Sequence, residues 1–273
     1  MNQQIKRDIL KKKRLFLFDI DGTIAIDQNL LDGTRELLDY IKTVGGRAIY
    51  ITNNSTKSRA DYIEKFAKWN IQTSESDFIT ASYAVCLYLD HYHRNDKIYV
   101  AGTNSFVQEL RAWGFQIVTE MEAGISVVLI GFDNELTYQK VEDVCRLLAD
   151  PQITYLATNP DLCCPTAFGS VPDCGAICEM IGYAVKRKPK FLGKPNPIIV
   201  DISIEQTGFS KEETLVVGDR LYTDIAVGIH ANVDTAVVFT GEALPKDCVK
   251  TEYPPTWQFE NVRGIWKAIV GEE

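Results

Sequence analysis

The sequence lacks several features that mark particular classes of protein. Eighteen apolar residues never run together, which argues against a membrane-spanning helix, and the polar stretch 1–10 has no apolar segment of signal-peptide type. The sequence also contains no fixed-period repeat and no low-complexity segment. We therefore expect a folded, cytoplasmic protein that has no membrane partner.

Clustered positive charge is scarce as well. The formal net charge is -8, and the only dense basic run is Lys11 to Arg14, directly before the first apolar segment. Proteins that bind nucleic acid usually carry a basic patch or stripe. We therefore do not expect nucleic acid to be a partner.

The cysteines offer no disulfide framework. There are seven, an odd number, and none lies in a Cys-x-x-Cys pair, so we expect reduced thiols. Four of them are close enough in sequence to make a zinc site the alternative: Cys163, Cys164, Cys174 and Cys178. We favour the interpretation in which Cys174 and Cys178, one helical turn apart, face a core as small apolar side chains.

Length and composition fit a globular protein. Hydrophobic residues make up 45% and charged residues 24%, which are ordinary values. A chain of 273 residues suits one large domain, or a core that carries an inserted second one. We favour two units.

The first eighty residues alternate strands and helices. Leu15 to Phe18 and Ala48 to Ile51 are short apolar runs typical of strands buried on both faces. A helix follows each run, the first capped by Asp32 and the second spanning Thr56 to Trp69. This alternation predicts an α/β fold with a doubly wound, Rossmann-like parallel sheet.

The middle of the chain repeats the alternation and then returns to the first pattern. The expected middle strands are 97–101, 126–130 and 154–157, and the expected helices are 104–113 and 138–148. After an exposed linker at 186–190, we expect a helix at 198–204 and strands at 214–217 and 235–239. The sequence therefore predicts a core of residues 1–80 plus 188–273, with an inserted α/β unit at residues 81–187.

Polar clusters occur where the predicted core strands end. They are Asp19-Ile20-Asp21-Gly22-Thr23, Thr52-Asn53-Asn54, and Gly218-Asp219 followed by Asp224. Ligands of open parallel sheets bind at the carboxyl ends of the strands, so we expect these clusters to converge. Lys194, at the return into the core, is expected to reach the same crevice.

Such a set suits phosphate chemistry. Asp19 and Asp219 would repel each other unless a hard divalent cation lay between them, and Mg²⁺ is the best candidate. We expect Thr52, Asn53, Lys194 and loop amides near Gly22 to bind the phosphoryl group. A metal and a lysine form a sufficient electrostatic clamp for phosphoryl transfer.

Carboxylates can supply the remaining roles. Asp19 can attack as the nucleophile, Asp21 can act as general acid and base, and Asp224 can support the metal or the lysine. Each motif alone also fits a turn or a helix cap. The complete set in one order, each piece at a strand end, favours the functional interpretation.

These residues resemble the haloacid dehalogenase superfamily of aspartate-nucleophile phosphotransferases. Asp19 to Thr23, Thr52, Lys194, and Gly218-Asp219 with Asp224 resemble its four motifs. The resemblance implies that Asp19 is the nucleophile and that the Asp21 carbonyl and Asp219 bind magnesium. The presence of Asp21 implies phosphate chemistry, since the dehalogenases lack this second carboxylate.

Longer stretches are similar to the NagD and 4-nitrophenylphosphatase branch, whose members insert a large α/β cap between the second and third motifs. The stretches are 51–55, 158–161, 193–197 and 218–225. The likeness implies that Asn159 and Asp161 in the cap face the substrate. Pro172-Asp173-Cys174-Gly175 departs from the branch, which has Pro-Gly before a glycine, and this bears on substrate preference.

The prediction is a magnesium-dependent phosphomonoesterase that acts on a small phosphate ester through an aspartyl phosphate. Nucleoside monophosphates and sugar phosphates are candidate substrates, and activity on 4-nitrophenyl phosphate is expected. A phosphotransferase or mutase would keep the site and change the acceptor. A non-catalytic binding module would keep only the fold. A homodimer is the oligomer that we consider.

Overall fold

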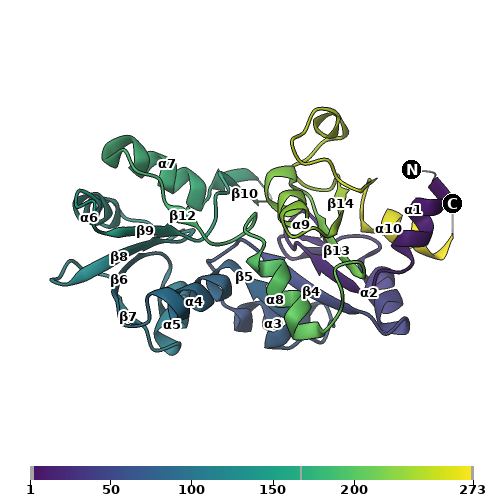
Figure 1. The fold of residues 1–273 in the computed structure, drawn as a ribbon, viewed down its shortest axis with the longest axis horizontal. Helices are drawn as coiled ribbons and strands as arrows, with labels where there is room; N and C mark the ends of the chain where they lie inside the picture. Colours follow the sequence, from purple (N-terminus) through teal and green to yellow (C-terminus); the bar gives the residue numbers. More distant parts are fainter. Residues whose placement is uncertain (1–2, 167, 272–273) are drawn as a thin grey trace.

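A computed structural model describes residues 3–166 and 168–271. The chain forms two α/β units that lie side by side along the long axis of the molecule (Figure 1). Segments from both halves of the chain build a six-stranded sheet, and the middle segment builds a five-stranded sheet. The expected α/β architecture, a doubly wound parallel sheet with an inserted α/β unit, is confirmed.

The larger sheet is entirely parallel and has the order β15-β14-β13-β1-β4-β5. Its strands are β1 (Leu15–Phe18), β4 (Arg47–Thr52), β5 (Phe78–Thr80), β13 (Thr214–Gly218), β14 (Asp234–Val238) and β15 (Trp257–Phe259). β1 lies between β4, the next core strand along the chain, and β13, which comes after the smaller unit. This arrangement is the topological switch point at which open α/β sheets bind ligands.

Helices cover both faces of this sheet because its central strands are apolar on both sides. Phe16 and Phe18 of β1 pack toward α1 (Gln3–Leu10), α2 (Thr34–Thr43), α3 (Arg59–Lys68) and α10 (Val262–Val270). Leu15 and Leu17 pack toward α8 (Ile198–Thr207) and α9 (Ala226–His230). Burying each such side chain contributes about 1.5–3 kcal/mol relative to leaving it exposed.

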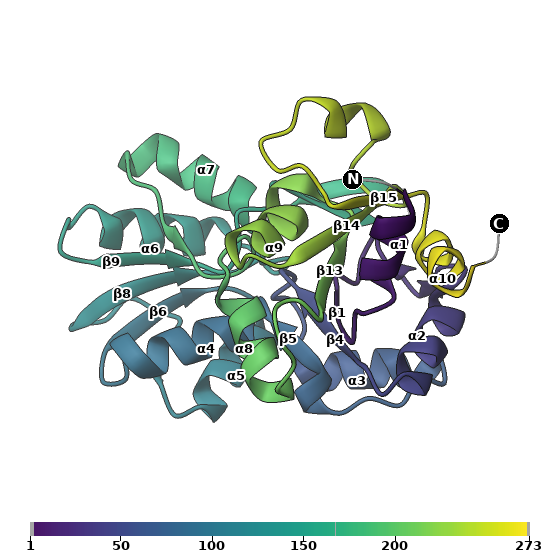
Figure 2. The ribbon, with the colours of Figure 1, turned by 45° about the vertical axis from the view of Figure 1, so that its right-hand side comes forward.

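The smaller sheet has the order β12-β9-β8-β6-β7 and is also parallel. Its strands are β6 (Lys97–Ala101), β7 (Gln116–Val118), β8 (Ile125–Ile130), β9 (Thr154–Ala157) and β12 (Lys190–Phe191). One face packs against α4 (Ala81–Tyr92) and α5 (Asn104–Ala112). The other face packs against α6 (Tyr138–Leu148) and α7 (Cys174–Val185), as Figure 2 shows.

Short elements complete the fold. Two antiparallel hairpins are formed by β2 (Ala25–Ile26) with β3 (Asn29–Leu30), and by β10 (Cys163–Thr166) with β11 (Gly169–Pro172). The 3₁₀ segments are η1 (Glu75–Asp77) and η3 (Pro245–Val249), and η2 (Leu221–Ile225) is a π-helical turn directly after β13. Cys164 on β10 lines a pocket together with Asp19, which follows β1, and Thr52, the last residue of β4.

One expected helix cap is wrong. Gly33, and not Asp32, is the N-cap residue of α2, with φ of 82°. The Asp32 carboxylate instead forms an ion pair with Arg263 on α10, so a tertiary contact replaces the local cap. The helix expected from Thr56 begins later, at Arg59, because the Ser58 side chain accepts a hydrogen bond from the Asp61 N–H.

The return from the smaller unit to the core also differs in detail from the expected linker. Lys190–Phe191 is not linker: it pairs with Leu156 and Ala157 of β9 as the edge strand of the smaller sheet. The Gly193 N–H then donates to the Thr158 carbonyl, directly before Lys194. The boundaries at 80/81 and 187/188 remain our prediction.

No helix in residues 3–166 and 168–271 is both long and apolar enough to cross a membrane.

Candidate active site

Asp19 and Asp219 lie at the carboxyl ends of two neighbouring parallel strands. β1 and β13 pair in register, with Phe18 opposite Val217, and the Asp19 N–H donates to the Val217 carbonyl over 2.8 Å. The two acids follow these strands and therefore point into the same crevice. The expectation that they end adjacent strands is confirmed.

Three carboxylates meet in this crevice. One oxygen each of Asp19, Asp219 and Asp224 lies within 4.8 Å of the others, and all three side chains are buried. The Thr23 Oγ1 lies 3.3 Å from Asp19 Oδ2 and 3.5 Å from Asp219 Oδ1, between the first two acids. Burial raises the pKa of Asp19, an effect that Lys194 opposes and that Asp224 and Asp219 increase.

Lys194 supplies a buried cation to this cluster. Its Nζ lies 2.6 Å from Asp19 Oδ1 and 2.6 Å from Asp224 Oδ1, and its side chain is 2% exposed. Burial opposes the charged ammonium, but Asp19 and Asp224 outweigh this effect and raise the pKa of Lys194. The lysine is therefore charged, and it holds Asp19 in place.

Asp219, the acid that Lys194 does not contact, gives the crevice the donor groups that a divalent cation prefers. Burial, with Asp224 next, raises the pKa of Asp219. Asp219 and Asp19 are hard oxygen donors that face each other out of water, and Lys194 compensates only one of them directly. A hard divalent cation relieves this repulsion. The donor set therefore fits a divalent metal ion.

Asp21 lines the same crevice and is less buried than Asp19, Asp219 and Asp224. Its side chain is half-buried, and its Oδ1 lies 3.1 Å from the Nζ of Lys65 on α3. The Gly22 that follows has φ of 95°, and a Cβ at this position would lie 2.8 Å from Asp219 Oδ2. Only glycine permits the loop after β1 to pass this close to the second acid.

Two of the groups expected to bind phosphate already have hydrogen-bond partners within the protein. The Gly22 N–H donates to the Ala25 carbonyl over 2.8 Å, so the loop itself uses this amide. The Asn53 side chain is used as well: its Nδ2 donates to Asp161 Oδ2, and its Oδ1 accepts from the Lys194 N–H. Thr52, the last residue of β4, lines the crevice, and its Oγ1 accepts from the Asn54 N–H.

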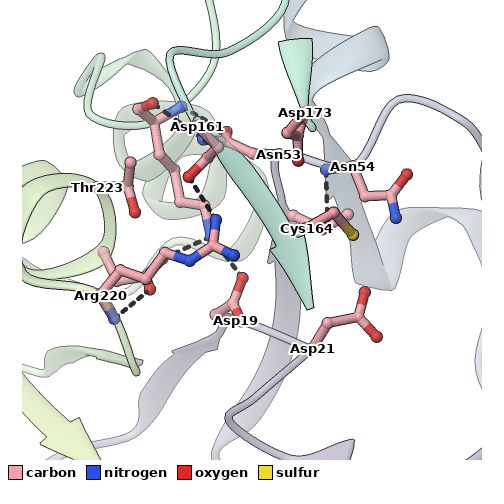
Figure 3. A pocket seen from close by; sticks show the side chains of 12 residues that line it. Asp19, Asp21, Asn53, Asn54, Asp161, Cys164, Asp173, Arg220 and Thr223 are labelled. Carbon is pink, nitrogen blue, oxygen red and sulfur yellow. Dashed lines mark hydrogen bonds and ion pairs between the residues drawn. The ribbon is translucent and has the colours of Figure 1, made fainter. Parts of the chain in front are cut away.

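Figure 3 shows that the smaller unit covers this crevice from the side opposite Asp19 and Asp21. Its contribution to the pocket is Asp161 after β9, Cys164 on β10 and Asp173 before α7. The full lining is Asp19, Asp21, Thr52, Asn53, Asn54, Asp161, Cys164, Asp173, Lys194, Arg220, Thr223 and Asp224. Almost every side chain that would meet a ligand is polar.

Asn159 and Asp161, the two expected cap contacts, are buried and bonded to protein groups. Asn159 Nδ2 donates to Asp161 Oδ2 over 2.8 Å and to Asp173 Oδ1 over 3.0 Å. Burial, with Asp161 next, raises the pKa of Asp173 to about 7. The structure thus brings Asp161 to the pocket, as expected, whereas Asn159 is not part of the lining and donates to Asp161 and Asp173, which are.

Arg220 is a site residue to which the sequence analysis assigned no role. It follows Asp219, its Nη1 lies 2.5 Å from Asp161 Oδ1, and its Nε lies 3.0 Å from Glu242 Oε2. Its position in the sequence, one residue after the strand-end acid Asp219, could have pointed to a role in the site. The backbone N–H of Glu242, which donates to Asp219 Oδ2 over 2.7 Å, had no such signal.

The cysteine cluster divides between two elements. Cys163 and Cys164 lie on β10, and Cys174 and Cys178 lie on α7. The latter two are buried in the core of the smaller unit with Sγ atoms 4.0 Å apart, as the favoured interpretation expected.

Comparison with known proteins identifies the family. Residues 16–116 match the family model described as haloacid dehalogenase-like hydrolase, and residues 191–265 match the family model described as HAD-hydrolase-like. It is 31% identical over 253 residues to an acid sugar phosphatase of Staphylococcus epidermidis, which covers 93% of this chain and 96% of that protein.

Solved structures agree with this result. The 4-nitrophenylphosphatase of Thermotoga maritima superposes with a TM-score of 0.88 at 34% identity, over 96% of this chain and 99% of that chain. NagD of Escherichia coli K-12 superposes with a TM-score of 0.81 at 28% identity, over 92% of this chain and 97% of that chain. The chain therefore belongs to the haloacid dehalogenase-like hydrolases, in the branch of NagD and the 4-nitrophenylphosphatases.

Proposed function

We propose that the chain is a magnesium-dependent phosphomonoesterase that hydrolyses small phosphate esters through a phosphoryl group carried on Asp19. Its family makes it a phosphatase, and the metal, the intermediate and the residue roles are our proposal. One observation carries it: the Asp19 carboxylate, at a strand end beside Asp219, is held by the buried Lys194 over 2.6 Å.

In the first step, a carboxylate oxygen of Asp19 attacks the phosphorus while the bond to the leaving oxygen breaks. Lys194 holds Asp19 in place and lies beside the phosphoryl group whose charge it balances. The Thr52 hydroxyl, which lines the same pocket, binds a phosphoryl oxygen. Asp21, which lines the same pocket, gives a proton to the leaving oxygen.

In the second step, water replaces Asp19 at phosphorus. Asp21, now a carboxylate, takes the proton of the attacking water, and inorganic phosphate leaves. The acyl phosphate makes this step easy, so one difficult displacement becomes two easier ones. Asp224 supports both steps by holding Lys194 over 2.6 Å.

Asp19, Asp219 and the main-chain carbonyl of Asp21 would hold the magnesium ion. Once bound, this ion neutralises the charge of the phosphoryl oxygens. Mg²⁺ suits the site because it binds through one or two carboxylates together with a substrate phosphate. Oxygen donors of this kind occur at the adjacent ends of β1 and β13.

The substrate class that we propose is a small phosphate ester with a polar leaving group. On the cap side, the Asp173 carboxylate and the Cys164 thiol line the pocket and suit the hydroxyls of a sugar or polyol. Nucleoside monophosphates remain candidates. The named activities of the relatives, acid sugar phosphatase and 4-nitrophenylphosphatase, support small esters.

A phosphate-release assay tests the proposal. Purified protein is incubated with 4-nitrophenyl phosphate and a panel of sugar and nucleoside monophosphates, with MgCl₂ or with EDTA, and kcat/KM is compared. Turnover that requires Mg²⁺ is expected, with one phosphoryl group on the Asp19 peptide after an acid quench. Turnover unaffected by EDTA would refute the metal, and transfer to an added alcohol without free phosphate would identify a phosphotransferase.

A further inference from the structure

The Asp161 carboxylate is enclosed by hydrogen-bond donors of the protein. It follows β9 in the smaller unit and is 1% exposed. Its Oδ1 accepts from Arg220 Nη1 over 2.5 Å, and its Oδ2 accepts from Asn53 Nδ2 over 2.6 Å and from Asn159 Nδ2 over 2.8 Å. Both oxygens are thus occupied by N–H groups before any substrate arrives.

Arg220 connects Asp161 to the loop after β13. Its main-chain N–H donates to Asp224 Oδ2 over 3.0 Å, and it directly follows Asp219. The guanidinium also donates to the Cys163 carbonyl on the β10 hairpin over 3.0 Å. The segment that carries two catalytic-site acids is therefore fastened to the smaller unit.

Asn53 connects Asp161 to the catalytic lysine. Asn53 Oδ1 accepts from the Lys194 N–H over 2.8 Å, and Asn53 Nδ2 donates to the Lys194 carbonyl over 3.0 Å. The same Nδ2 donates to Asp161 (Figure 3). Lys194 Nζ in turn holds Asp19. An unbroken path of hydrogen bonds thus runs from the cap carboxylate to the main chain of Lys194.

From these contacts we infer that Asp161 is a positioning residue, which fastens the smaller unit to both catalytic loops, and not the substrate-facing residue that the resemblance to the NagD branch implied. Charge-assisted bonds to a buried carboxylate are strong and geometrically specific. Reaction rates depend steeply on how such supports hold the reacting groups. The kinetic test of this inference rests on the proposed phosphatase function.

The substitution Asp161→Asn tests it. An amide nitrogen cannot accept a hydrogen bond, so at least one of Arg220, Asn53 and Asn159 would face another donor. We expect kcat/KM to fall by up to about 100-fold, by the same factor for 4-nitrophenyl phosphate and for glycerol 2-phosphate. The first leaving group has no hydroxyl for Asp161 to bind, and the second has two. A loss confined to glycerol 2-phosphate would overturn the inference.

Asp133→Asn is the matched control. Asp133 is also a buried, ion-paired carboxylate of the smaller unit, 4% exposed, with Lys140 Nζ 2.7 Å from its Oδ2. Its second oxygen accepts from the Glu135 N–H, so both partners lie within the smaller unit. We expect wild-type kinetics from this variant. An equal loss in both variants would mean that any buried cap charge matters, which contradicts a specific role for Asp161.

Arg220→Lys covers the case in which Asp161→Asn does not fold. Lysine keeps the charge but cannot reach both Asp161 and the Cys163 carbonyl in a planar fork. Circular dichroism verifies folding, and a smaller loss that is again equal for the two substrates is expected. A loss that differs between the substrates would count against the inference.

Hydrogen exchange provides a readout that needs no activity. The Lys194 N–H is protected by Asn53, so Asp161→Asn should speed exchange in a peptide covering 192–196, and Asp133→Asn should leave it unchanged. Unchanged exchange in Asp161→Asn would refute the positioning role. If the wild-type protein hydrolysed neither phosphate, the proposed function would fail while this measurement still decided the inference.

Discussion

Lys194 and Asp19 are separated by 175 positions in the chain, and the Lys194 Nζ lies 2.6 Å from Asp19 Oδ1. Asp224 completes the arrangement on the other side of the ammonium, also at 2.6 Å. A lysine buried to this degree remains charged only because two carboxylates face it. The reaction centre is therefore a balance of buried charges, and removing the Lys194 ammonium affects catalysis and stability together.

Asp19→Asn should abolish turnover and leave the fold intact. An amide cannot attack phosphorus or carry the phosphoryl group, so we expect kcat to fall by roughly 10⁴-fold or more. Phosphate release and an unchanged circular dichroism spectrum test this. Asp39→Asn, an exposed aspartate on α2, is the control and should behave as wild type. Normal phosphate release by Asp19→Asn would remove Asp19 as the nucleophile.

Asp21→Asn should slow both proton transfers, by about 10²–10⁴-fold in kcat for an alkyl phosphate. Phosphorylation by 4-nitrophenyl phosphate should suffer less, because its leaving group needs little protonation. The phosphorylated Asp19 peptide should then accumulate, which mass spectrometry of acid-quenched samples can measure. Equal losses for both esters and no accumulation would contradict the acid–base role.

Lys194→Met should destabilise the protein in a pH-dependent way. It leaves Asp19 and Asp224 buried without their cation, a situation that typically costs about 3–5 kcal/mol. The pKa of Asp19 is already raised, so the folded variant binds protons more tightly than the unfolded chain. The stability of the variant is then greatest at low pH, and it falls as the pH rises above the pKa that Asp19 has in the unfolded chain.

Urea unfolding of Lys194→Met at pH 5 and pH 8, with EDTA present, measures this effect. The difference in free energy of unfolding from wild type should be larger at pH 8. A difference that did not change with pH would mean that the carboxylates are compensated by another group.

Asp173→Asn should remove a loss of folding stability that the wild-type protein shows as the pH rises. The folded pKa of Asp173 is raised from 3.8 to about 7, so the folded state keeps a proton that the unfolded chain gives up. The wild type therefore loses stability as pH rises from about 4 to about 7, by up to about 4 kcal/mol at 1.4 kcal/mol per pKa unit.

The variant keeps the acceptor that Asp173 Oδ1 offers to Asn159 and to the Cys174 N–H, and it cannot ionise. Thermal unfolding between pH 4 and pH 8 should show a smaller decline than in wild type. Parallel curves for the two proteins would show that Asp173 titrates normally.

The sequence alone determined the framework of this protein. Leu15 to Phe18 and Thr214 to Val217 are buried on both faces and apolar apart from Thr214, which only a sheet with helices on both sides accommodates. Because parallel strands end at the same edge, the acids that follow them had to converge. Asp19, Asp219 and the general chemistry could therefore be predicted from local pattern.

Only the tertiary structure decided how the two units meet. Lys190–Phe191 belongs to the smaller sheet, and Asp32 binds Arg263 in place of capping α2. Arg220 and Asp161 are 59 positions apart, on different units, and no periodicity relates them. Their pairing depends on the docking of one folded unit on another, where a buried charge must find a partner. Local sequence sets which strands form, but long-range contacts set which charges those strands bring together.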